Sequence, residues 1–144
     1  MERRRGAFQV WGGVSTLVLL TMCQKEGPEA QVARAYAEVV AALEERDPGA
    51  VVDHLDDRFQ GPDGLPKAQV RLLLLGIFRQ GPIKVRRLRD SITVKGDDAE
   101  QEVLLLLTQG GDSLLPQDAS KRGYRLTWRR RGAHWKVAAV EALP

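Results

Sequence analysis

The hydrophobic residues of this chain change their spacing at Gly81-Pro82, and that change limits the fold more than any other feature. Before it, apolar residues recur at positions 32, 35, 36, 39, 40 and 43, the stripe of an amphipathic helix. After it, Tyr124, Leu126 and Trp128 alternate with polar residues, as on a half-buried strand. Helices followed by a meander of strands favour an α+β domain: three N-terminal helices packed on a curved, mainly antiparallel sheet.

Local signals divide this domain into elements. Pro28 opens the first helix, and Asp47 caps a short second helix that begins at Pro48. A third helix begins at Pro66, with Val70, Leu73, Leu74, Ile77 and Phe78 on its buried stripe. The expected strands cover residues 56–60, 83–94, 103–107, 124–130 and 135–140, with a turn at 61–64 and a polar connection over 109–123. A phase change near Arg86-Arg87 predicts a bulge or bend.

The N-terminal segment has the pattern of an export signal. Three arginines within the first five residues precede an uncharged stretch over 6–24, which ends in Leu20-Thr21-Met22-Cys23. Cys23 is the only cysteine, so no internal disulfide can form. The stretch resembles the lipobox of bacterial lipoproteins, although Met22 stands where Gly, Ala or Ser is usual. We expect a signal peptide at 1–22, a lipidation site and tether at 23–28, and one domain at 29–144. An uncleaved anchor or an ordinary signal peptide is the alternative.

The domain resembles the nuclear-transport-factor-2-like superfamily, which includes ketosteroid isomerase. The resemblance spans Glu29 to Leu143 and is most specific at Ala41–Asp47, followed by Val51-Val52 and Asp56-Asp57. The last hairpin, 128–140, also fits. The resemblance implies a cone with a pocket between the helices and the concave sheet, and dimerisation through the sheet. These motifs identify a scaffold, and a scaffold alone does not define an activity.

Asp63 lies where ketosteroid isomerases place their general base. Tyr36 and Tyr124 are candidate oxyanion donors, while Val39 occupies the position of the isomerase's helical tyrosine. The competing interpretation places Asp63 in a Pro-Asp-Gly turn, where aspartate bonds the local backbone. The departure at Val39 disfavours steroid-isomerase chemistry.

Apolar and aromatic residues are candidates for the pocket wall. Packing in the core explains most of them equally well. The candidates are Tyr36, Phe78, Leu126, Trp128 and Trp135.

Charge is unevenly distributed along the chain. Residues 24–66 carry four basic and ten acidic side chains, whereas residues 67–144 carry 15 basic and eight acidic ones. A basic sheet surface could bind anionic lipid head groups, envelope polymers or an acidic partner. Alternatively, the arginines only keep an outer face soluble. The export signal and the lack of interleaved aromatics disfavour nucleic acid. The residues concerned are Lys84, Arg86, Arg87, Arg89, Arg125, Arg129, Arg130 and Arg131.

Other site signatures are weak or missing. His54 with Asp56 and Asp57 forms the sole histidine–carboxylate group, a poor metal ligand set, and His134 follows a turn. No GxSxG, GxGxxG or GxxxxGK[ST] motif occurs. We therefore expect no metal and no cofactor.

Taken together, these patterns favour an exported, lipid-anchored, non-enzymatic domain of the cell envelope that binds a small apolar ligand or a protein partner. Two alternatives stay open. One is a small isomerase- or hydratase-like enzyme with Asp63 as its base. The other is a structural module that forms a homodimer through the sheet.

Overall fold

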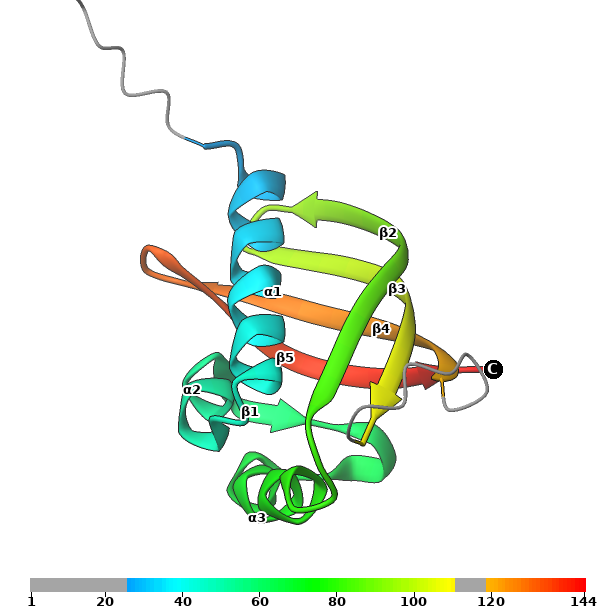
Figure 1. The fold of residues 1–144 in the computed structure, drawn as a ribbon. Coiled ribbons are helices and arrows are strands. Elements are labelled where there is room, and N and C mark those ends of the chain that lie inside the picture. The colour runs from blue at the N-terminus through cyan, green and yellow to red at the C-terminus, as the bar shows by residue number, and fades with distance from the viewer. Residues whose placement is uncertain (1–25, 111–118) are drawn as a thin grey trace, which may run out of the picture.

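The computed structural model describes residues 26–110 and 119–144, which form one α+β unit (Figure 1). The helices are α1 (Pro28–Glu44), α2 (Pro48–Asp53), the 3₁₀ turn η1 (Pro62–Gly64) and α3 (Lys67–Phe78). The strands are β1 (Leu55–Gln60), β2 (Ile83–Lys95), β3 (Asp98–Gln109), β4 (Ala119–Arg131) and β5 (His134–Leu143). Within the described part of the chain, no helix is long and apolar enough to cross a membrane.

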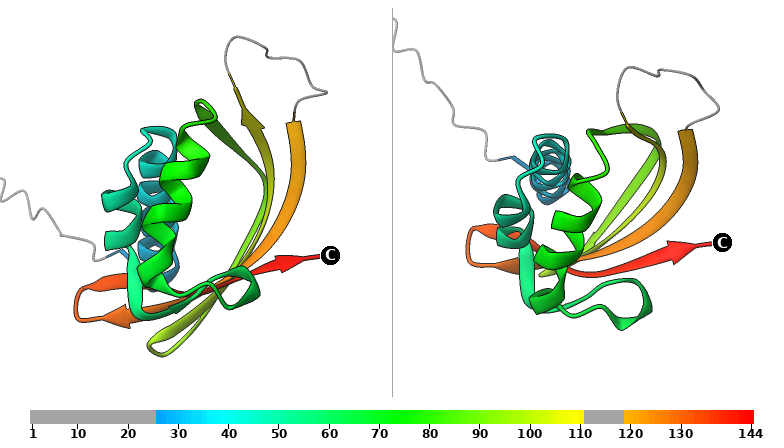
Figure 2. Two further views of the ribbon diagram at one scale, coloured as in Figure 1. Left: turned by 90° about the horizontal axis from the view of Figure 1, so that it is seen from below. Right: turned by 60° about the horizontal axis from the view of Figure 1, so that its bottom comes forward.

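The five strands form one sheet in the order β1-β5-β4-β3-β2. β1 runs parallel to β5, and the other neighbours are antiparallel. The sheet curves strongly, and the helices lie against its concave side (Figure 2). The expected α+β fold, with three helices on a curved and mainly antiparallel sheet, is therefore confirmed.

The starts of the helices follow the local signals in the sequence. Pro28 occupies the first turn of α1, where its missing N–H costs nothing. The carboxylate of Asp47 caps α2 by accepting a hydrogen bond from the Ala50 N–H at 3.0 Å. The two helices meet at a tight corner that turns α2 towards α3.

The predicted bulge is present in β2, at Leu88. Arg87 pairs with Leu105 and Arg89 with Leu104, so Leu88 is an extra residue with no partner on β3. A bulge bends its strand and increases the local twist. The register of β4 on β5 shifts as well, next to Trp128. These two irregularities lie in the curved part of the sheet and help it to wrap around the helices.

Two local expectations were wrong. β4 begins at Ala119, so the last five residues of the segment expected to be a polar connection, 119–123, are strand. Pairing with β3 brings these polar residues into the sheet despite their composition. Leu73 was expected on the buried stripe of α3 but is 48% exposed, because the helix buries a narrower face that contains Val70, Leu74 and Phe78.

The core fills the space between α1, α3 and the concave face of the sheet. Its largest fully buried side chain is that of Trp128. At one end of the sheet this packing is dense. Towards the other end, the side chains leave the cavity described below.

Candidate functional site

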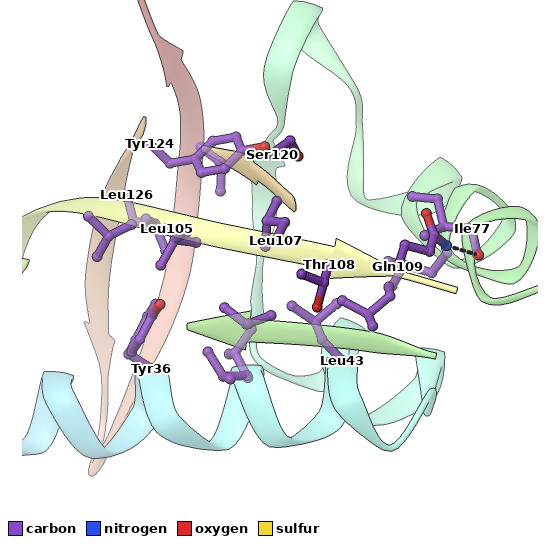
Figure 3. A pocket seen from close by; sticks show the side chains of 17 residues that line it. Tyr36, Leu43, Ile77, Leu105, Leu107, Thr108, Gln109, Ser120, Tyr124 and Leu126 are labelled. Atoms are coloured by element: carbon purple, nitrogen blue, oxygen red, sulfur yellow. Dashed lines mark hydrogen bonds between the residues drawn. The ribbon is translucent and has the colours of Figure 1, made fainter. Parts of the chain in front are cut away.

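A cavity of about 560 Å³ lies between the helices and the concave sheet (Figure 3). Its walls come from α1, from the inner side of α3 and from strands β2 to β5. Five lining residues carry polar side-chain atoms, and the others are Val, Leu or Ile. The polar five are Tyr36, Thr108, Gln109, Ser120 and Tyr124, and the apolar ones are Val39, Val40, Leu43, Leu74, Ile77, Ile83, Val85, Val103, Leu105, Leu107, Leu126 and Val140.

Among the described residues, the cavity is open where β3 ends and β4 begins. Gln109 and Ser120 line it and are themselves exposed to solvent. The amide Nε2 of Gln109 donates a hydrogen bond to the carbonyl oxygen of Ile77 at 2.7 Å (Figure 3). This bond ties the last turn of α3 to the end of β3, so the helix forms one side of the opening.

Tyr36 supplies the only buried side-chain polar atom without a hydrogen-bond partner in the described residues, its hydroxyl oxygen. The residue is 6% exposed, and in Figure 3 its ring lies across the cavity from Leu105. Burial raises the pKa of Tyr36 to about 12; Arg87 lowers it in part and Asp90 raises it further. The hydroxyl is therefore protonated at neutral pH and can donate a hydrogen bond to a bound molecule.

A chain of hydrogen bonds runs through the core beside Tyr36. The Trp128 indole Nε1 donates to Gln101 Oε1 at 2.9 Å, and Gln101 Nε2 donates to Asp90 Oδ1 at 3.0 Å. Arg87 Nη1 donates to Asp90 Oδ2 at 2.8 Å, and its guanidinium carbon lies 5.9 Å from the centre of the Tyr36 ring. These groups satisfy one another, which leaves the Tyr36 hydroxyl as the group without a partner.

Asp63 does not reach this cavity. It lies in η1 with a φ of 57°, is exposed, and borders a separate shallow hollow beside Pro62 and Leu65. The expected turn role therefore describes its position, and the general-base role at the cavity is wrong. Tyr36 and Tyr124 do line the cavity, but none of the described residues that line it is a carboxylate or a histidine.

The expected pocket wall is only partly at the cavity. Tyr36 and Leu126 line it, whereas Phe78, Trp128 and Trp135 are buried in the core and lie outside its lining. The two tryptophans are held by hydrogen bonds: Trp128 by Gln101, and Trp135 through its Nε1 to Gln31 Oε1 at 3.1 Å. Their size suits them to the tightly packed end of the cone.

Most of the expected basic surface is neutralised. On β4, Arg125 pairs with Glu102 at 3.0 Å, and Arg129 pairs with Asp98 at 3.2 Å, both across the β3–β4 ladder. Arg87 also has a carboxylate partner, Asp90, on its own strand. Two further arginines at the end of β4 are paired in the same way, namely Arg130 with Asp97 and Arg131 with Asp56.

The remaining basic residues of that set lie on β2. Lys84, Arg86 and Arg89 are exposed and form no ion pair with any carboxylate of residues 26–110 and 119–144. The unpaired members of that set thus lie on β2, on either side of the bulge at Leu88.

His54 and Asp56 have structural partners. The Nδ1 of His54 lies 2.8 Å from the Ala50 carbonyl oxygen, and its Nε2 lies 2.9 Å from Glu38 Oε2. Asp56 is bound by Arg131. His134 is exposed at the hairpin turn. Among the residues that the structure describes, no three His, Cys, Asp or Glu side chains converge on a point.

Sequence reasoning missed Gln101 and the three polar residues at the opening. One signal was present: Gln101 stands in the inward phase of β3, between Ala99 and Val103, where a polar side chain must find a buried partner. The polar residues at the opening, Thr108, Gln109 and Ser120, stood in or next to the segment expected to be a connection. Cys23 lies outside the described residues.

Comparisons with known proteins support the fold. No protein-family model matches the chain, and no curated protein sequence shows significant similarity to it. Solved structures do match. An NTF2-like protein of unknown function from Pseudomonas putida KT2440 superposes with a TM-score of 0.69 at 16% identity, covering 79% of this chain and 84% of the other.

Two further matches carry proposed activities. A protein from Streptomyces avermitilis, proposed to be a dehydratase of the NTF2-like family, has a TM-score of 0.69 at 19% identity, covering 81% of this chain and 94% of its own. A proposed scytalone dehydratase from Novosphingobium aromaticivorans DSM 12444 has a TM-score of 0.69 at 14% identity, covering 78% of this chain and 80% of its own. At such identities the likeness shows the fold: this chain has the NTF2-like cone.

Proposed function

We propose that this protein is a non-enzymatic binding domain that holds a small, mainly apolar ligand in its cone. The observation that carries the proposal is the lining of the cavity. Twelve of its 17 described lining residues are aliphatic, and it contains one buried hydroxyl, that of Tyr36, without a partner. Concave, mostly apolar sites with a few placed polar groups are typical of small-molecule binding.

The same lining argues against an enzyme of the dehydratase or isomerase kind. Proton transfer in such a reaction needs a group that accepts and returns a proton within hydrogen-bond reach. No described lining residue is an aspartate, glutamate, histidine, lysine or cysteine. The tyrosines could donate a hydrogen bond, but at neutral pH Tyr36 is protonated and cannot act as a base.

The Tyr36 hydroxyl also indicates which ligand should be preferred. A ligand with one hydrogen-bond acceptor on an apolar body would satisfy this hydroxyl, whereas a hydrocarbon would leave it without a partner. Such a contact is worth roughly 1 kcal/mol, about a fivefold difference in affinity.

A matched pair of ligands tests the proposal. Displacement of the fluorescent probe N-phenyl-1-naphthylamine by fluorenone and by fluorene compares a ketone with its parent hydrocarbon. We expect both to bind, and fluorenone to bind about fivefold more tightly. In Tyr36→Phe the two affinities should become equal.

A variant that fills the cavity provides a second test of the proposal. Leu107 lines the cavity, so Leu107→Trp should abolish displacement. Leu88→Trp, at a leucine of the β2 bulge that is 47% exposed and does not line the cavity, is the matched control. Binding that survives Leu107→Trp would show that the ligands bind elsewhere and would contradict the proposal.

We further propose that the domain is exported and anchored by a lipid on Cys23. Its support is the arrangement of arginines 3–5, the uncharged stretch and the lone cysteine. Cys23→Ser should abolish incorporation of radiolabelled palmitate. Intact mass spectrometry of protein extracted from membranes would report cleavage before Cys23. An unprocessed chain of full length would favour an uncleaved anchor instead.

A further inference from the structure

The described polar side chains of the cavity are gathered at two places, with aliphatic side chains between them. At the first place, Tyr36 of α1 lies across from Leu105 of β3 (Figure 3). The second place lies past Leu107, and the Tyr124 side chain lies beside Ser120 there (Figure 3). The polar residues of the second place are Thr108, Gln109, Ser120 and Tyr124. A bound molecule can therefore form hydrogen bonds at two separate points.

The stretch between the two places is aliphatic. Leu107 of β3 pairs with Val85 of β2, and both line the cavity. The facing helix α1 contributes Val39 and Val40 to the lining. A polar group of a ligand that lies here leaves water without gaining a partner, which weakens binding.

The regular geometry of α1 and β3 gives the distance between the two places. In Figure 3, Tyr36 and Leu105 lie at one end of the lining, and Leu43 and Gln109 lie at the other. Leu105 and Gln109 are four residues apart on β3, which corresponds to about 13 Å. Tyr36 and Leu43 are seven residues apart on α1, which corresponds to about 10 Å. An extended chain of about eight carbon–carbon bonds spans this distance.

The two ends offer different hydrogen-bonding groups. The Tyr36 hydroxyl has no partner, so it can donate a hydrogen bond to an acceptor on the ligand. At the other end, Gln109 uses its Nε2 to donate to Ile77, which leaves its Oε1 as an acceptor. The Ser120 hydroxyl can also accept. A carbonyl oxygen therefore suits the Tyr36 end, and a hydroxyl group suits the other end.

We infer that the cavity selects elongated ligands that carry a carbonyl at one end and a hydroxyl about 10–13 Å away at the other. The carbonyl oxygen accepts a hydrogen bond from Tyr36, and the ligand hydroxyl donates to Gln109 or Ser120. The aliphatic stretch holds the carbon chain between them. This inference rests on the proposed function, because it names the class of ligand that the same cavity holds.

Three ketones test this class of ligand. In 10-hydroxydecan-2-one the hydroxyl stands at the far end of the chain, in 7-hydroxydecan-2-one it stands near the middle, and 2-decanone has none. The two hydroxyketones have the same composition, so a difference between them reports the position of the hydroxyl. Each is used to displace N-phenyl-1-naphthylamine from the full chain. The same titration of Leu107→Trp, in which the cavity is filled, gives the displacement that comes from other sites.

We expect 10-hydroxydecan-2-one to bind at least about fivefold more tightly than its 7-hydroxy isomer. Tyr36→Phe should weaken the binding of all three ketones by a similar factor and leave the ratio between the isomers unchanged. The double variant Gln109→Met/Ser120→Ala should bring that ratio close to one, while 2-decanone binds as before. Ser91→Ala, at an exposed serine of β2 outside the cavity lining, is the matched control and should leave every affinity unchanged.

Two results would overturn the inference. The first is equal affinity for the two hydroxyketones in the unmodified protein. The second is a preference for 10-hydroxydecan-2-one that survives in the double variant, because the hydroxyl would then not bind to Gln109 or Ser120. A different result identifies failure of the proposed function itself: 2-decanone does not displace the probe, or displaces it equally from Leu107→Trp. In that case both proposals are wrong.

Discussion

Arg131, at the end of β4, binds the carboxylate of Asp56, the second residue of β1. Its Nε lies 2.7 Å from Oδ1 and its Nη2 lies 3.3 Å from Oδ2. Asp56 is 3% exposed, and β1 is the edge strand that pairs only with β5. This two-point contact therefore ties the edge of the sheet to the β4–β5 hairpin.

The first prediction concerns acid stability. The hydrogen bond from Arg131 holds the pKa of Asp56 below its usual value of 3.8, with burial opposing it. Because the pKa of Asp56 is lower in the folded than in the unfolded state, its ionisation stabilises the protein at pH values above the unfolded-state pKa. That contribution is lost as the pH falls through the folded-state pKa. Arg131→Ala leaves a buried carboxylate without its partner. We expect its acid-unfolding midpoint, followed by circular dichroism, to move to higher pH.

The control for this variant is Arg34→Ala, which removes an exposed ion pair with Glu26. Exposed pairs contribute about 0–1 kcal/mol, so its acid midpoint should stay near that of the wild type. Equal midpoints for both variants would show that Asp56 does not need Arg131.

The second prediction concerns Tyr36. Because a buried hydroxyl without a partner costs free energy, Tyr36→Phe should raise the free energy of unfolding at pH 7 by about 1 kcal/mol while it weakens fluorenone binding. Urea denaturation measures the first effect. A destabilised Tyr36→Phe would mean that the hydroxyl has a partner in the free protein.

The same residue predicts an alkaline effect. Burial raises its folded pKa to about 12, above the ordinary value of 10.0, so ionisation favours the unfolded state, and the wild type loses stability as the pH rises from 10 toward 12. The difference in stability between wild type and Tyr36→Phe should therefore grow across this interval, in favour of the variant. A constant difference between pH 9 and the pH of alkaline unfolding would contradict the burial of this hydroxyl.

The third prediction concerns Gln101, which joins Trp128 to Asp90. Gln101→Leu leaves the buried indole N–H without an acceptor and should cost about 1–3 kcal/mol in urea denaturation. Trp128→Phe removes the N–H itself. The double variant should lose less free energy of unfolding than the sum of the losses in the two single variants, because no donor is then left without its acceptor. Strictly additive losses would argue against this hydrogen bond.

The fourth prediction compares two glycines. Gly81 has a φ of +125°, and a Cβ there would lie 3.1 Å from the Gly110 Cα, so Gly81→Ala should cost about 1–3 kcal/mol. Gly76 lies within α3, where a Cβ would meet nothing within 4 Å. Gly76→Ala should therefore stabilise the protein by roughly 0.5–1 kcal/mol. Thermal denaturation of both variants should give shifts of opposite sign.

Local features of the fold could be predicted because they depend on neighbours in the chain. The stripe from Val32 to Leu43 makes α1, Asp47 caps α2, and the phase change near Arg86 marks the bulge at Leu88. Tyr36 and Leu126 could be placed at a pocket because their positions in the periodic pattern turn them inward.

The sequence alone thus determined the order, type and approximate limits of the elements, and with them the α+β class, because hydrophobic periodicity, caps and turns act over a few residues. Tertiary structure decided which side chains meet. It placed the carboxylates of β3 opposite the arginines of β4, and Gln101 between Trp128 and Asp90. It also left Leu72 exposed and turned Asp63 away from the cavity. Such contacts depend on strand register and packing between distant segments, where a one-residue shift would exchange every partner.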